Sequence, residues 1–185
     1  MRSYAGGVIT DLAEVARQGM ARSAENLQFR RYLAAHHQPV EAFHVIAAKV
    51  QERIDCTQCA NCCRYSIVSV RAAEVARIAA YLEMDEAAVV QHYTVPDRES
   101  PRARTLRSEG NGCVFLKDNR CSIYAARPEA CRNFPHVAPG KHSLGGRLES
   151  HCRWAPLCPI LFNALEEYKH VVGFRMRSQI DEGLG

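Results

Sequence analysis

Apolar residues recur at helical spacing near both ends of this chain. Residues 10–35 open at Thr10-Asp11 and place scattered Leu, Val and Tyr among alanines and arginines, which favours one long helix. Pro39 suits the first turn of a second helix, which runs on toward Cys56. Its apolar stripe consists of Phe43, Ile46, Ala47, Val50 and Ile54. Pro159 opens a last helix with an apolar face formed by Leu161, Leu165, Tyr168, Val172 and Met176.

The segment after the second helix predicts shorter elements. Arg64–Val70 is rich in β-branched residues and predicts a strand. Ser69 is placed to cap a helix that reaches Leu82, and Asp85 to cap another that reaches Tyr93. Thr94–Gly112 is the least regular stretch, and it is either a solvated loop or a patch for an anionic partner. Four arginines support the second interpretation: Arg98, Arg102, Arg104 and Arg107.

Short apolar runs at Cys113–Leu116 and Cys121–Tyr124 enclose a polar turn. This pattern predicts a β-hairpin in which each strand opens with a cysteine. Pro128 and Pro135 bound a short helix that carries Cys131. The stretch from His136 to His151 contains glycines and predicts a loop.

Length and composition fit a globular protein. The chain has 185 residues, which predicts one domain, and its 47% hydrophobic and 24% charged content is ordinary. We therefore expect an α+β fold, mainly helical, in a single domain over residues 1–185 with a small β-hairpin. A cysteine-rich metal-binding centre at about 52–158 would lie between flanking helices at 10–54 and 159–180.

Charge and hydropathy argue against two classes of partner. The net charge of +4 is mild, so we expect no nucleic-acid partner. No apolar run approaches the roughly 20 residues needed to cross a bilayer, so we expect no membrane partner. An unidentified protein partner stays open.

The strongest chemical signal is the sequence Cys-Thr-Gln-Cys-Ala-Asn-Cys-Cys at Cys56–Cys63. Thiols spaced three residues apart in one tight loop can turn toward a common centre. Five further cysteines follow in the chain: Cys113, Cys121, Cys131, Cys152 and Cys158. Nine cysteines in 185 residues is a high content, and four of them within eight residues indicate a metal site.

Core packing and disulfide formation explain these cysteines less well than a metal site does. Free cysteines pack well as small apolar side chains, but packing does not produce four in one short loop. A disulfide framework needs an oxidising compartment. Met1–Gly7 has no long apolar run and no secretory layout, so we expect a cytoplasmic location. In a reducing compartment, clustered cysteines are metal-binding or catalytic.

Four blocks of sequence occur in an order typical of one family: Cys56–Cys63, Gly112–Leu116, Cys121–Tyr124 and Arg127–Pro135. Together they resemble the YkgJ-type cysteine-cluster family, the zinc- or iron-chelating CxxCxxCC domain, over roughly residues 52–155. A similar cluster occurs in the flagellin lysine N-methylases. The chain shows no Gly-rich loop after a strand for S-adenosylmethionine, so that activity is not carried over.

The resemblance implies a set of eight metal-binding cysteines, with Cys158 outside it. These eight are Cys56, Cys59, Cys62, Cys63, Cys113, Cys121, Cys131 and Cys152. Adjacent side chains diverge, so we expect one of Cys62 and Cys63 to serve a second centre or the core. His136 and His151 could replace one thiolate, although a histidine beside a metal more often donates a hydrogen bond to its ligands.

The spacing favours iron–sulfur over zinc. One [4Fe–4S] cluster would be held by Cys56, Cys59, Cys62 and a remote fourth cysteine, with Cys131 and Cys113 the leading candidates. The C-x2-C-x2-C run resembles the bacterial ferredoxin spacing, although the Cys-Pro continuation is missing. Two zinc sites of four thiolates each are the alternative, but zinc sites more often use two C-x2-C pairs, and this chain has one such run. Mononuclear or multinuclear iron is the third possibility.

Three functions remain open at this point. The first is an iron–sulfur protein for electron transfer or redox sensing. The second is a structural zinc module that binds a partner. The third is an iron-dependent enzyme with an open metal position. No nucleophilic triad or phosphate-binding loop is visible in the sequence, so it does not decide whether the protein is an enzyme.

Overall fold

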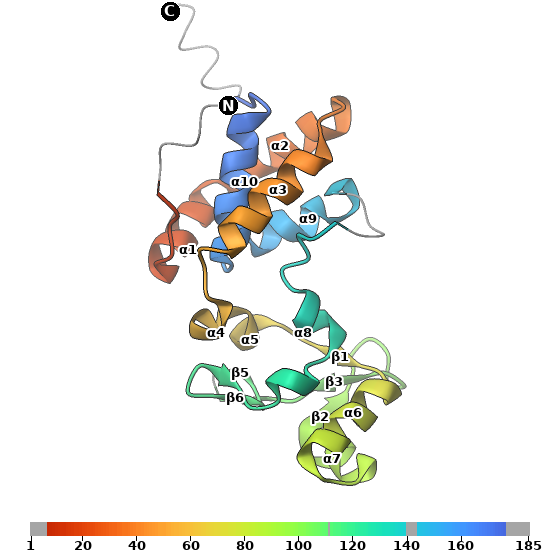
Figure 1. Cartoon of the computed structure of the whole chain (residues 1–185). Helices are drawn as coiled ribbons and strands as arrows, with labels where there is room; N and C mark the ends of the chain where they lie inside the picture. The colour runs from red at the N-terminus through yellow and green to blue at the C-terminus, as the bar shows by residue number, and fades with distance from the viewer. Residues whose placement is uncertain (1–6, 111, 140–143, 177–185) are drawn as a thin grey trace, which may run out of the picture. The chain divides into compact units, whose positions relative to one another are not determined.

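The structure is a computed structural model, which describes residues 7–110, 112–139 and 144–176 (Figure 1). The fold is α+β and mainly helical, as predicted. The chain divides into two compact units, one of residues up to Ile54 together with those from Pro135 onward, the other of Asp55–Phe134. The single-domain organisation stays a prediction, and each unit is described by itself.

The first unit is a helical bundle built from both ends of the chain. Its helices are α1 (Leu12–Ala21), α2 (Ser23–Ala35), α3 (Val40–Gln51), α9 (Leu144–Trp154) and α10 (Pro159–Val171). Helix α10 packs against α1, α3 and α9 (Figure 1). Pro159–Leu165 are all buried. Because α10 is covered along most of its length, it is the central helix of this unit.

Two predicted helix starts in this unit are confirmed. The side chain of Asp11 accepts a hydrogen bond from the backbone N–H of Glu14 at 2.8 Å, which caps α1. Pro159 is the first residue of α10, where its missing N–H costs nothing. The buried side chain of Asn163 binds both backbone groups of Ile9, at 2.9 and 2.8 Å, and so ties the segment before α1 to α10.

The single helix predicted over residues 10–35 is wrong, because the chain forms α1 and α2 with a break at Arg22. Arg22 has φ −92° and ψ 10°, outside the helical region. Its guanidinium pairs with Glu166 at 2.9 Å and lies 5.4 Å from the ring centre of Phe162. The break therefore lies where the side chain of Arg22 contacts α10.

The loop predicted from His136 to His151 is also wrong in its second half, which forms α9. Leu144, Leu148, His151 and Ala155 are all buried and follow a helical spacing. Gly145 and Gly146 lower the intrinsic helix propensity of this stretch and hide that pattern. His142 lies outside the described residues.

The second unit combines short helices with small antiparallel sheets. Its helices are α4 (Cys56–Cys59), α5 (Asn61–Tyr65), α6 (Ala72–Leu82), α7 (Glu86–Tyr93) and α8 (Glu129–Asn133), with a 3₁₀ turn, η1, at Tyr124–Ala126. Strands β1 (Ser69–Val70), β2 (Thr94–Pro96) and β3 (Arg104–Leu106) form an antiparallel sheet in the order β1-β3-β2. Two strand pairs follow, β4 (Ser108–Glu109) with β5 (Gly112–Cys113) and β6 (Leu116–Lys117) with β7 (Arg120–Cys121).

Two local predictions in this unit need correction. Most of the strand expected at Arg64–Val70 is absent, because the chain up to Tyr65 continues as α5 and only Ser69–Val70 pair as strand β1. Ser69 does not cap α6. That cap position belongs to Arg71, whose backbone N–H donates to the Glu74 carboxylate at 2.9 Å.

The predicted hairpin is confirmed in a shorter form. Leu116 pairs with Cys121 in β6 and β7, and the turn residues Asp118 and Asn119 have φ of 47° and 62°. Two consecutive positive φ values match a two-residue hairpin turn. Cys113 instead pairs with Ser108 in the preceding strand pair.

The stretch predicted to be irregular is partly ordered by its own arginines. Arg104 donates to the Thr94 hydroxyl at 2.6 Å, and Arg107 donates to the carbonyl of Gln91 at 2.9 Å. Both side chains thus bind the C-terminal end of α7, where carbonyl groups lack helical partners. Two of the four arginines therefore serve the fold, while Arg98 and Arg102 belong to the loop between β2 and β3.

A compact apolar core supports this unit. Its buried members are Val68, Val70, Val75, Ile78, Ala79, Val89, Leu106, Phe115, Ile123 and Ala126. Cys113, Cys121 and Cys131 are half-buried and pack against it. The elements that carry these three thiols are thus anchored by ordinary hydrophobic packing.

Candidate metal centre

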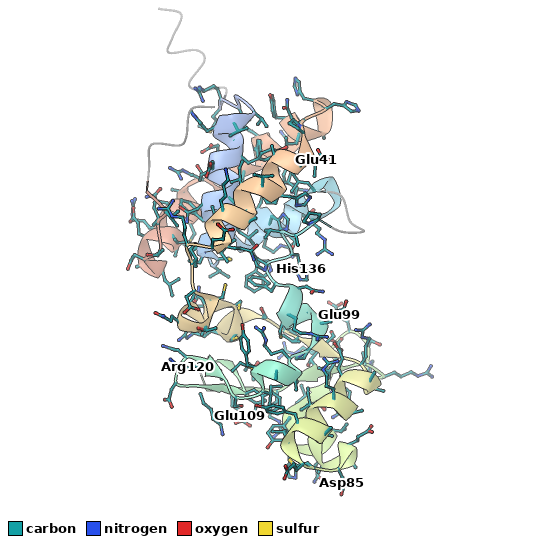
Figure 2. The ribbon with its side chains drawn as sticks, in the orientation of Figure 1. Glu41, Asp85, Glu99, Glu109, Arg120 and His136 are labelled. Carbon is teal, nitrogen blue, oxygen red and sulfur yellow. The ribbon has the colours of Figure 1, made fainter. Side chains whose placement is uncertain are left out.

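The first cysteines of the second unit lie on two very short helices joined by one residue. Asp55 begins α4 by accepting hydrogen bonds from the backbone N–H and the hydroxyl of Thr57, at 2.8 and 2.6 Å. These bonds lower the pKa of the Asp55 carboxyl, and Arg120 on the β6–β7 hairpin adds to this shift (Figure 2). Ala60 follows α4 with φ 48°, a left-handed conformation that turns the chain sharply into α5.

Helix α5 presents Cys62 and Cys63 and is fixed by its own arginine. The guanidinium of Arg64 donates to the carbonyl of Cys59 at 3.2 Å and to the side chain of Asn119 in the hairpin turn. Gly112 lies so close that a Cβ there would meet the Cys63 carbonyl oxygen at 2.8 Å. The cysteine loop and the strands after it are therefore packed together at backbone level.

Cys113 and Cys121 share a local geometry that suits thiolates. The backbone N–H of Phe115 donates to the sulfur of Cys113, and the N–H of Ile123 donates to that of Cys121. In both cases the donor lies two residues after the cysteine. Such bonds stabilise the charged sulfur, and hydrogen bonds to ligand sulfurs are one way a protein tunes a metal centre.

Cys131 is brought to the same group by α8. The buried carboxylate of Glu74 accepts the backbone N–H of Glu129 at 2.8 Å, which ties the start of α8 to α6. Pro128 precedes the helix and Phe134 ends it, as the two prolines predict. The position of Cys131 therefore depends on one buried acidic side chain from a different helix.

Electrostatic interactions show which thiols lie near one another. Cys63 interacts with five other cysteines, with Cys62 through a hydrogen bond and with the rest through charge: Cys56, Cys113, Cys121 and Cys131. Cys113, Cys121 and Cys131 also interact among themselves. Cys63 is thus shared between the loop of α4 and α5 and the thiols of the hairpin and α8.

The thiols of this group differ in their acidity. Burial raises the pKa of Cys113 to about 11 and that of Cys131 to about 12, and neighbouring thiolates add to both shifts. A hydrogen bond from the Cys62 thiol lowers the pKa of Cys63 to about 7 against the effect of burial, with help from Arg127 and Arg64. Cys63 is therefore more readily ionised near neutral pH than Cys113 or Cys131.

Arg127 is a functional candidate that sequence reasoning missed. Burial raises the pKa of Cys56, Cys121 and Cys131, and the charge of Arg127 opposes that rise; the same charge helps to lower the pKa of Cys63. The guanidinium of Arg127 lies 3.5 Å from the ring centre of Tyr124 and donates to that residue's carbonyl at 3.0 Å. The sequence does carry a signal for this role: Arg127 stands directly before Pro128, in the same block as the ligand candidate Cys131.

The donor set fits a thiophilic metal, although its atoms do not converge on one point. All nine cysteines are reduced thiols. Within the described ranges, no three Cys, His, Asp or Glu side chains stand where a single metal ion could bind them. Thiols, nearby cations and N–H donors to sulfur are nevertheless what zinc and iron–sulfur centres use.

The remaining cysteines belong to the first unit. Cys152 lies on α9, where burial raises its pKa to about 11 and Lys169 opposes the shift. Its role as the eighth ligand stays a prediction. Cys158 is buried just before α10, so packing explains it.

The two histidines considered as ligands are also placed in the first unit. The ring of His151 stacks on Phe43 and is 3.3 Å from the carbonyl of His136, which Figure 2 labels after α8. Burial lowers the pKa of His151 to about 4, so it is neutral at physiological pH. These contacts with α3 and with the chain before α9 show that packing in the first unit explains the burial of His151.

Comparison with known protein families identifies the family of this cysteine-rich chain. Residues 55–153 match the CxxCxxCC family, described as "Putative zinc- or iron-chelating domain". The chain belongs to the CxxCxxCC family. The match covers more than half of the chain and confirms the resemblance carried by the four cysteine blocks. No solved structure matches this chain.

Membership of the CxxCxxCC family supports metal binding by this protein, with zinc or iron as the metal. The matched residues begin at the capping Asp55 and end one residue after Cys152. They therefore include every cysteine of the predicted ligand set. In the part of the chain that the structure describes, every helix is too short or too polar to span a bilayer.

Proposed function

We propose that the cysteine cluster of the second unit holds an iron–sulfur centre and that the protein uses it for electron transfer or redox sensing. The observation that carries this proposal is the grouping of thiols around Cys63. Seven of the predicted ligands belong to one small unit: Cys56, Cys59, Cys62, Cys63, Cys113, Cys121 and Cys131. When bound, an iron–sulfur cluster supplies one-electron exchange.

The spacing of the thiols supports a cluster over a single ion. In a cubane each thiolate binds a different iron, so the sulfurs stand farther apart than around one zinc ion. Cys56, Cys59 and Cys62, spaced three residues apart in one short loop, suit three corners of such a cubane. Zinc would need four sulfurs at about 2.3 Å from one atom.

The side chains around the thiols suit a negatively charged centre. Arg64 and Arg127 place positive charge beside Cys63, and the N–H groups of Phe115 and Ile123 stabilise charged sulfur. Cys56 is exposed while the other six thiols of this unit are half-buried. A centre with one accessible side can exchange electrons with a partner and still be shielded from water on the other.

The test is to purify the protein without oxygen and measure iron, acid-labile sulfide and zinc per chain. We expect a brown protein that bleaches on reduction or on exposure to air, with a paramagnetic signal after reduction. A Cys63→Ser variant should lose iron and colour, and a Cys158→Ser variant serves as the matched control. A colourless preparation that holds zinc and takes up no iron on reconstitution would contradict the proposal.

Zinc is the second candidate, and one specific observation favours it. The predicted ligand set has eight cysteines, enough for two sites of four thiolates each, which is the ligand number of a structural zinc site. In that case the protein would be a structural module that binds a partner. Close to two zinc ions per chain, with no redox couple, would select this function.

A further inference from the structure

The helical unit contains a pocket that metal binding does not use. Its volume is about 430 Å³, which lies within the range of small-molecule sites. It is bounded by residues 27–34 of α2, the start of α3 and the first half of α9. Tyr168 of α10, which is buried in the unit, closes its inner end.

Most of the pocket wall is apolar. Leu27 and Leu33 of α2, Val40 of α3 and Leu148 of α9 all line it. Leu27 is 47% exposed. An apolar ligand body that covered these side chains would remove them from water, and such burial is the main source of affinity in ligand pockets.

The polar groups of the wall favour a negative charge. Two arginines line the pocket and no acidic residue does among the described residues. Arg30 is already paired with Glu149 at 2.8 Å, but the side chain of Arg31 has no ion pair or hydrogen bond within the described part of the chain. Arg31 thus offers an uncompensated guanidinium at the edge of an apolar pocket.

The carboxamide of Gln38, which lines the pocket, is held in place by a hydrogen bond. The Gln38 side chain donates to the hydroxyl of Tyr32 at 3.1 Å, and that hydroxyl donates to the carbonyl of Val172 at 3.0 Å. This chain of bonds fixes Gln38 beside the pocket. The polar part of the site is therefore partly organised before any ligand arrives.

From these contacts we infer that the pocket binds a monocarboxylate with an apolar body, of the size of a medium-chain fatty acid. A carboxylate matches the planar guanidinium of Arg31, with which it can form two parallel hydrogen bonds. A phosphate group would call for more donors than one unpaired arginine provides. A cationic ligand would meet two positive side chains and no negative one in the described wall.

The test measures binding of decanoate to the metal-loaded full chain by calorimetry, at concentrations below micelle formation. Decanol is the neutral comparison and inorganic phosphate is the anion without an apolar body. We expect decanoate to bind more tightly than decanol and to weaken as salt rises, since the arginine is exposed. Phosphate should show no binding.

Three variants locate the ligand. Arg31→Gln should weaken decanoate about tenfold and leave decanol unchanged, because only the charged contact is lost. Arg98→Gln, an exposed arginine of the other unit, is the matched control and should have no effect. Ala34→Trp places a large ring in the wall and should block both ligands.

Several results would overturn the inference. These are a wild-type chain that does not bind decanoate, equal decanoate affinity in wild type and Arg31→Gln, or phosphate binding as tight as decanoate. Iron and zinc contents are measured on every variant and should not change. The inference about the pocket can therefore be overturned while the proposed metal centre is upheld. The proposed metal centre can likewise be overturned while the inference about the pocket is upheld.

Discussion

At the scale of single residues, Cys63 differs from the cysteines beside it in the sequence. The spacing of Cys56, Cys59 and Cys62 makes those three the obvious set, and an adjacent fourth cysteine is redundant in that pattern. In the structure Cys63 interacts with the thiols of the hairpin and of α8. That grouping depends on Gly112 packing against the Cys63 backbone, a long-range contact that spacing does not reveal.

The first prediction separates ligands from packed cysteines. Cys59→Ser and Cys63→Ser should each lower bound metal, because Cys59 is central in the loop and Cys63 joins two groups of thiols. Cys158→Ser should keep the wild-type metal content, since Cys158 is buried before α10. Metal per chain is measured by elemental analysis on variants of confirmed helical content. Equal losses in Cys158→Ser and Cys59→Ser would show that the ligand set is misdrawn.

The second prediction concerns Gly19, where helix propensity and packing have opposite effects. Glycine to alanine in a helix normally stabilises by about 1 kcal/mol. Here a Cβ would lie 2.6 Å from Cα of Pro156 and 2.9 Å from its nitrogen, and backbone atoms cannot swing away. We expect Gly19→Ala to reduce the free energy of unfolding by about 1–3 kcal/mol.

Chemical denaturation followed by circular dichroism measures this change. Gly7→Ala is the control, because nothing lies within 4 Å of a Cβ built there. A Gly19→Ala protein more stable than wild type would mean that α1 does not pack on Pro156 in solution.

At the scale of elements, the sequence predicts helices and turns where local signals agree with packing. Asp11, Pro128 and Pro159 mark their helices correctly because a cap or a missing N–H acts within one turn. The break at Arg22, which escapes prediction, lies where Arg22 pairs with Glu166. Helix α9 is not predicted because Gly145 and Gly146 lower its helix propensity. Its buried apolar stripe is recognised only when the residues that it packs against are known.

The third prediction concerns the carboxylate that joins α6 to α8. Glu74 is buried, which raises its pKa, but bonds from the N–H groups of Glu129 and Arg71 and from the Arg71 side chain outweigh this, so its pKa is lowered. The charged form therefore stabilises the fold above the ordinary pKa of 4.5 and this contribution is lost as pH falls. Glu74→Gln should destabilise the protein by about 1–3 kcal/mol at pH 7.

Thermal unfolding of wild type and Glu74→Gln at matched pH checks both parts of this prediction. The difference between the two proteins should be full at neutral pH and should shrink below about pH 4.5 as the wild-type carboxylate protonates. Glu99→Gln, at an exposed loop position of the same unit, should match wild type throughout. A difference that grows on acidification would show that Glu74 is not held as a carboxylate.

At the scale of the whole molecule, the two units have different sources of stability. The first unit buries aromatic and aliphatic side chains, with Phe29, Phe43 and Tyr168 fully buried. In the second unit the core around α6 and α7 is apolar, but α4 and α5 contain no buried cysteine and are each about one turn long. Helices of that length are not stable alone, and we expect metal ligation to add to the order that the Asp55 cap and the Arg64 hydrogen bonds provide.

The last prediction is that metal removal acts locally. Chelation under reducing conditions should increase hydrogen exchange at residues 55–65, 112–122 and 129–133, which carry the seven thiols of the second unit. Helices α3 and α10 should keep their protection because their burial does not depend on thiols. Helical circular dichroism should fall only slightly, since the segments that loosen contribute few helical residues. Uniform loss of protection across α3, α10 and the cysteine segments would mean instead that metal organises the entire fold, as in domains too small to bury a core of their own.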